Sequence, residues 1–93
     1  MNLTEHLLIS LTAECAAVTT SAATSLRLGP DNSAPLTASL NDLMGVIWLL
    51  ETNGIIPLDW QDYPAQSNKM RETKTTMREA AKTGALQLDR ELL

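Results

Sequence analysis

The chain has 93 residues, of which 44% are hydrophobic, with no Phe, two Trp and one Tyr. A domain of this size buries only a modest core, so we expect help from a partner copy, and the aliphatic composition favours an all-α protein over a sheet. The net charge is −4, but residues 1–68 carry seven acidic residues against Arg27 alone, whereas residues 69–93 carry six basic and four acidic residues. Basic charge is therefore concentrated in one C-terminal element.

Several features indicate a soluble, cytoplasmic protein. The only cysteine, Cys15, cannot form an internal disulfide, which suits a reducing cytosol, and its apolar position predicts a buried structural thiol. The first ten residues, "MNLTEHLLIS", lack the basic region of a secretion signal. The longest nearly continuous apolar run, "LMGVIWLL", has eight residues, far short of the ~20 that span a bilayer. We expect neither a membrane nor a nucleic-acid polymer as partner.

The pattern of apolar residues predicts two long helices in the first half of the chain. In residues 3–28, apolar side chains recur at steps of three and four, at Leu7, Leu11, Cys15, Val18, Ala22 and Leu26. Gly29 and Pro30 end this helix. Ser33 is the predicted N-cap of a second helix over residues 34–53, which is apolar nearly all round between Leu43 and Leu50 and is therefore expected to be central.

A third helix is predicted over residues 65–83, stopping at Gly84, which completes an antiparallel helical bundle in a single domain. Its only large apolar residues are Met70 and Met77. A basic stripe follows one side, formed by Arg71, Lys74, Arg78 and Lys82. It is either a solvated face partly paired with Glu72 and Glu79, or a surface that meets phosphates or an acidic partner.

The order of these features resembles the phage branch of the MazG-like all-α nucleoside triphosphate pyrophosphohydrolases. The matching stretches are "LISLTAECAAVTTSAATSLRLG" at 8–29, "LTASLNDLMGVIWLLETNGII" at 36–56 and "NKMRETKTTMREAAKTGAL" at 68–86. In that family an E-x-x-E pair on the first long helix faces an E-x-x-D pair on the second. The four carboxylates hold magnesium, which bridges the triphosphate and activates water.

Carried onto this chain, the first pair falls at Glu14 and Ala17 and the second at Ser39 and Asp42. Two of the four carboxylates are thus replaced, which predicts a degenerate metal site with no cofactor, or with weakly bound Mg²⁺ on Glu14 and Asp42. A pocket with two acids beside a basic helix could hold an anionic nucleotide without cutting it. The residues expected to bind ligand are Glu14, Asn41, Asp42, Lys69, Arg71, Lys74 and Arg78.

Plainer interpretations stand beside these. Glu14 and Asp42 could be solvent-facing acids, and His6 a surface residue. Trp48 is expected in the core or at a subunit interface. Trp60 and Tyr63 could stack on a base, although packing against the bundle is the favoured interpretation.

Three functions remain open from the sequence. The first is a nucleotide-binding pseudoenzyme, assembled as a homodimer or homotetramer, which sequesters a nucleotide such as a host defence signal. The second is an active Mg-dependent pyrophosphohydrolase that has recruited a substitute acid, for instance Glu51. The third is a helical inhibitor that binds another protein.

Overall fold

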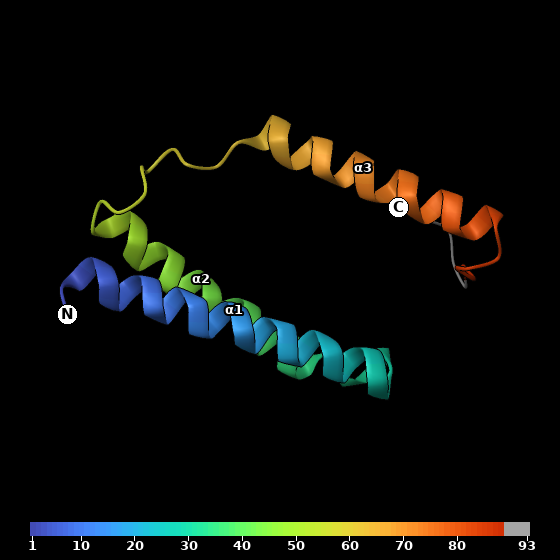
Figure 1. The fold of residues 1–93 in the computed structure, drawn as a ribbon, viewed down its shortest axis with the longest axis horizontal. Helices are drawn as coiled ribbons and strands as arrows, with labels where there is room; N and C mark the ends of the chain where they lie inside the picture. Colours follow the sequence, from blue (N-terminus) through green and yellow to red (C-terminus); the bar gives the residue numbers. More distant parts are fainter. Residues whose placement is uncertain (89–93) are drawn as a thin grey trace. The chain divides into compact units, whose positions relative to one another are not determined.

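A computed structural model describes residues 1–88, which contain three α-helices, one short 3-10 turn and no strand (Figure 1). The helices are α1 (Leu3–Leu28), α2 (Ala34–Thr52) and α3 (Tyr63–Lys82). The predicted all-α class and the three predicted helices are thereby confirmed to within two residues at each end. The chain divides into two compact units, the first covering Met1–Trp60 and the second beginning at Gln61.

Helix α1 begins and ends at residues whose backbone groups are satisfied locally. At its start, Asn2 Oδ1 accepts a hydrogen bond from the Glu5 N–H at 2.8 Å, and Asn2 Nδ2 donates to Glu5 Oε1 at 3.1 Å. This reciprocal pair resembles a capping box. At its end Gly29 has a φ of 97°, which a residue with a Cβ rarely adopts, and its N–H donates to the Ser25 carbonyl at 2.9 Å.

The short turn Pro30–Asn32 leads directly into α2. Ser33 stands before that helix as predicted, but its backbone is already helical and its side chain caps no N–H, so the predicted side-chain cap is wrong. The Ser33 carbonyl instead accepts from the Thr37 N–H at 3.0 Å. After the helix the chain folds back, and the N–H of Ile55 donates to the Leu50 carbonyl at 2.9 Å.

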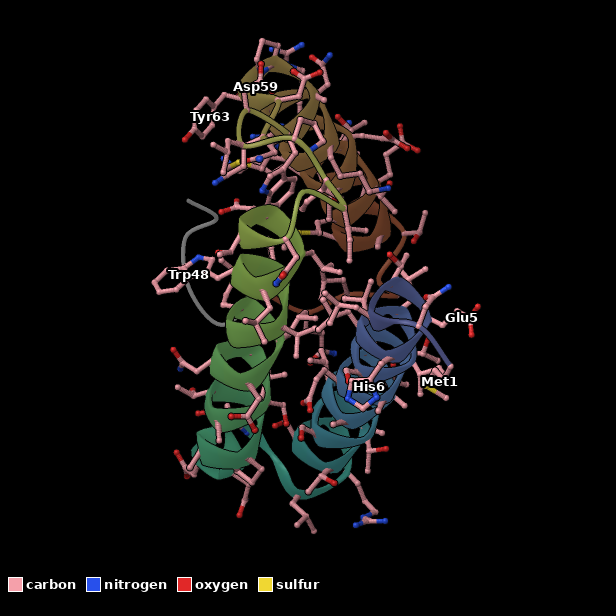
Figure 2. The ribbon with its side chains drawn as sticks, turned by 90° about the vertical axis from the view of Figure 1, so that its left-hand side faces the viewer. Met1, Glu5, His6, Trp48, Asp59 and Tyr63 are labelled. Atoms are coloured by element: carbon pink, nitrogen blue, oxygen red, sulfur yellow. The ribbon has the colours of Figure 1, made fainter. Side chains whose placement is uncertain are left out.

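Helices α1 and α2 lie side by side as an antiparallel hairpin (Figures 1 and 2). Only two apolar side chains of the described residues are buried, Leu7 at 6% exposure and Leu50 at 3%. The expectation of a buried Cys15 is therefore wrong, because the inward face of α1 runs through its neighbour Glu14 and leaves Cys15 exposed. Within the first unit, α2 contacts α1.

Helix α3 belongs to the second unit. It starts two residues earlier than predicted because Asp62 caps it, accepting a hydrogen bond from the Ala65 N–H at 3.0 Å. After Thr83 the chain turns at Gly84, where φ is 82°, and the Leu86 N–H donates back to the Ala80 carbonyl at 3.0 Å. The backbone of the turn thus satisfies a carbonyl group at the end of the helix.

One helix of the described residues, α1, is long and apolar enough by composition to cross a membrane. Core helices of soluble proteins and N-terminal signals share that property. The cytoplasmic location stays a prediction.

Candidate functional site

Glu14 lies on the side of α1 that faces α2. The half-buried residues of that side follow the helical period, at Ser10, Leu11, Glu14, Ala17, Val18 and Ser21. Glu14 is therefore partly shielded from water rather than fully solvated, and Ala17, its partner position in the resemblance, lies on the same side one turn later. Glu14 is therefore not the fully solvent-facing acid of the plainer interpretation.

Ser39 is the most buried polar residue of the described chain, at 9% exposure. Its hydroxyl donates to the Pro35 carbonyl at 2.9 Å and lies 2.7 Å from the hydroxyl of Ser21. With the Ser39 proton used on Pro35, Ser21 is the donor of the pair. The position at which the resemblance expects a carboxylate thus holds a hydroxyl that joins the two helices.

Asp42 and Asn41 are both exposed on α2 but face different directions, because consecutive helical residues are turned by about 100°. Asn41 Nδ2 donates to the Thr37 carbonyl at 2.9 Å. Asn41 also lines a shallow depression of about 290 Å³ with Met44, Gly45 and Trp48. Asp42 is not among the residues that line that depression.

No group of three His, Cys, Asp or Glu residues within the described residues could hold a metal ion. Of the two remaining carboxylates at the family positions, Glu14 is half-buried and Asp42 is exposed. Asp42 immediately precedes the inward residue Leu43, which places it on one flank of the hairpin. Such a pair fits at most a hydrated Mg²⁺ whose other ligands are waters and phosphates.

Glu51, the suggested substitute acid, already has a partner. The indole N–H of Trp60 donates to Glu51 Oε1 and ties the connection after α2 back onto that helix. Trp60 is 36% exposed and Tyr63 67% exposed, so the tyrosine ring is the more accessible of the two aromatic candidates. Figure 2 shows Tyr63 and Trp48 projecting outward from their helices.

The basic residues of α3 divide into two groups. Lys69 lies 3.8 Å from Glu72, one turn along the helix, and this is the sole ion pair within residues 1–88. Arg71, Lys74 and Arg78 form with Lys82 a stripe on another side of the helix and have no ion pair in the described part of the chain. Within residues 1–88 this stripe therefore makes no ion pair with Glu72 or Glu79, and Lys69 stands apart from the other predicted phosphate contacts.

Sequence reasoning missed Ser21, which the structure places opposite Ser39. The available signal was the short turn at residues 29–33, which forces an antiparallel hairpin and so sets residues before and after it opposite each other. Polar residues at helical spacing on both inward faces would then have indicated a hydrogen-bonded pair. No protein-family model, curated protein or solved structure matches this chain.

Proposed function

We propose that this chain is a nucleotide-binding protein of MazG-like fold that does not cleave its ligand efficiently. The observation that supports this most directly is the state of Ser39, whose hydroxyl is held between Ser21 and the Pro35 carbonyl. A hydroxyl used in this way is a poor substitute for a metal-binding carboxylate. With Ala17 as the other replacement, the hairpin lacks the means to hold two metal ions.

The basic stripe of α3 supports an anionic ligand. Its members carry no ion pair in the described part of the chain, and guanidinium groups such as those of Arg71 and Arg78 can donate two parallel hydrogen bonds to a phosphate. On the hairpin, Glu14 and Asp42 would hold at most one hydrated Mg²⁺. Binding would then survive removal of magnesium, because the stripe needs no metal to attract phosphate.

Calorimetry with mono-, tri- and cyclic nucleotides in EDTA tests the proposal. We expect saturable binding to at least one of them and unchanged ligand afterwards. Arg78→Gln should weaken that binding by at least about tenfold, or about 1.4 kcal/mol, whereas Arg27→Gln, which removes the same charge at the end of α1, should change it by less than about twofold. Absence of binding across the panel would refute the proposal.

The two other functions give different results in companion assays. An active pyrophosphohydrolase would release pyrophosphate with Mg²⁺ or Mn²⁺, and Asp42→Asn would abolish that release. If the chain is a protein inhibitor, a pull-down from host cells would recover one host protein in stoichiometric amount. Denaturing the purified chain would then release no nucleotide. In the phage setting that the resemblance suggests, binding without turnover would remove a signalling nucleotide from the host cytoplasm.

A further inference from the structure

The outward side of α2 carries the shallow depression of about 290 Å³ described above, which we call the Trp48 depression. Its lining residues, Asn41, Met44, Gly45 and Trp48, follow the helical period and so share one side of the helix. The buried residue Leu50 lies on the opposite side of the same helix, toward α1. The depression therefore opens away from the helix contact, and Figure 2 shows Trp48 projecting from that outward side.

The indole ring of Trp48 is a large flat apolar surface left in water. Trp48 is 64% exposed, whereas the other tryptophan, Trp60, is 36% exposed and donates its indole N–H to Glu51. Tryptophan is highly buried on average in folded proteins, so an indole this exposed is a candidate for contact with a ligand. Helical side chains lean toward the N-terminus, which brings the ring over the turn that contains Gly45.

Gly45 leaves space beside that ring at a cost to the helix. Glycine is less favourable in a helix interior than every residue except proline. The described residues do not require a glycine there, because a Cβ at position 45 would meet none of their atoms within 4 Å and the φ of Gly45 is not positive. Neither packing nor backbone conformation thus explains Gly45. Close approach of a flat ligand to the helix backbone does explain it.

The side-chain amide of Asn41 supplies the polar group of the depression. Its Nδ2 donates to the Thr37 carbonyl at 2.9 Å, which leaves one N–H donor and the Oδ1 acceptor for a ligand. An asparagine amide with both groups free can pair with the 6-amino group and the adjacent ring nitrogen of adenine. The described residues that line the depression carry no charge, so it suits a neutral ring.

We propose that the Trp48 depression binds the base of a nucleotide, with adenine preferred. The ring stacks on the Trp48 indole above Gly45, and its edge pairs with the Asn41 amide. Stacking accepts any base, so the amide supplies the preference. This inference rests on the proposed function for its class of ligand, but it uses no residue of the basic stripe. A protein partner could also use an exposed tryptophan, but would need neither the space at Gly45 nor a free amide.

Nuclear magnetic resonance on the unmodified chain tests the base site directly. The two tryptophans give two indole N–H resonances, and Trp60→Phe identifies the one that belongs to Trp48. Adenosine carries no phosphate, so it reports base binding separately from the stripe. We expect a saturable shift of the Trp48 resonance and none of the Trp60 resonance. Binding of N6,N6-dimethyladenosine, which lacks the amino N–H donors, should be at least about fivefold weaker.

A matched pair of variants separates the site from general effects on folding. Gly45→Leu fills the depression and should weaken adenosine binding at least about tenfold without lowering the Tm, because Leu is the better helix former. Ala16→Leu places the same side chain at an exposed position on the outward side of α1 and should change binding by less than about twofold. Asn41→Leu should abolish the preference for adenosine over its dimethyl analogue while stacking remains.

Four results would overturn the inference. The first is a Trp48 response no stronger than that of free N-acetyltryptophanamide, which would mean adventitious stacking. The second is undiminished binding to Gly45→Leu. The third is nucleotide binding in calorimetry that leaves the Trp48 resonance unmoved, in which case the proposed function would stand without this base site. The fourth is a protein partner lost in Trp48→Ala, with no response to adenosine.

The converse result would separate the base site from the proposed phosphate contacts. If adenosine binds at Trp48 but added phosphates bring no gain and Arg78→Gln has no effect, the phosphate role of the stripe fails. The base site is then supported on its own.

Discussion

Replacing Leu50 by Ala tests whether the hairpin depends on its very small interior. Leu50 is 3% exposed, and its neighbour Leu49, on the same helix, is 49% exposed. Losing three buried carbon atoms costs about 2.4 kcal/mol at ~0.8 kcal/mol each, and the cavity left behind raises the total to about 3 kcal/mol or more. The same change at Leu49 removes area already half in water and should cost about 1 kcal/mol, partly offset by the higher helix propensity of Ala.

The measurement is urea unfolding followed by far-ultraviolet circular dichroism, at one fixed protein concentration so that association does not alter the comparison. We expect the free energy of unfolding to fall about 2 kcal/mol further for Leu50→Ala than for Leu49→Ala. Equal losses for the two variants would refute the reasoning, because they would mean that the two leucines are equally covered in solution.

Two further comparisons concern backbone conformation and capping. Gly29 has a φ of 97° and Gly45 lies inside α2, and a Cβ at either position meets no atom within 4 Å. Gly29→Ala should therefore lower the Tm through strain, by about 4–8 °C per kcal/mol, whereas Gly45→Ala should raise stability by up to about 1 kcal/mol, as thermal unfolding will check. Asp62→Ala removes the cap of α3 and should cost about 1 kcal/mol, with reduced helical signal in circular dichroism. Asp59→Ala, which removes a carboxylate that makes no hydrogen bond within residues 1–88, should leave that signal unchanged.

The positions of the helices could be predicted from the sequence because their ends are marked by local chemistry. Gly29 ends α1, and Gly54 and Gly84 follow the other two helices, all with positive φ. These signals act within a few residues and need no tertiary contact. The start of α3 was predicted two residues too late because Asp62, its cap, lies in the polar connection "DWQDYP". In that connection only Trp60 and Tyr63 were assigned a possible role, as rings that stack on a base.

The inward face of α1 could be predicted only in part, since Leu7, Leu11 and Val18 of the apolar period lie inward and the other members do not. The apolar period of α1 runs through Cys15 and Leu26, but the packed side is rotated toward Glu14 and Ser21, because the Ser21–Ser39 hydrogen bond sets how the helices meet. A periodic pattern finds the most apolar side of a helix. The most apolar side need not be the side that packs against the neighbouring helix of the same chain.

For the candidate site, residue types predicted the chemistry only in part. The residues Ala17 and Ser39, which stand where the resembled family has carboxylates, are read from the sequence directly. The engagement of Glu51 by Trp60, and the pairing of Lys69 with Glu72, depend on side-chain positions that no spacing rule supplies. Among the predicted phosphate contacts, Arg71, Lys74 and Arg78 are the ones that make no ion pair within the described residues.

The small number of buried apolar side chains in the hairpin affects how well the protein resists proteolysis after synthesis. Leu7 and Leu50 are too few to offset the loss of chain entropy over some sixty residues. Newly made chains are then open to proteases whenever the hairpin unfolds, so any ligand that binds only the folded chain should lengthen its lifetime.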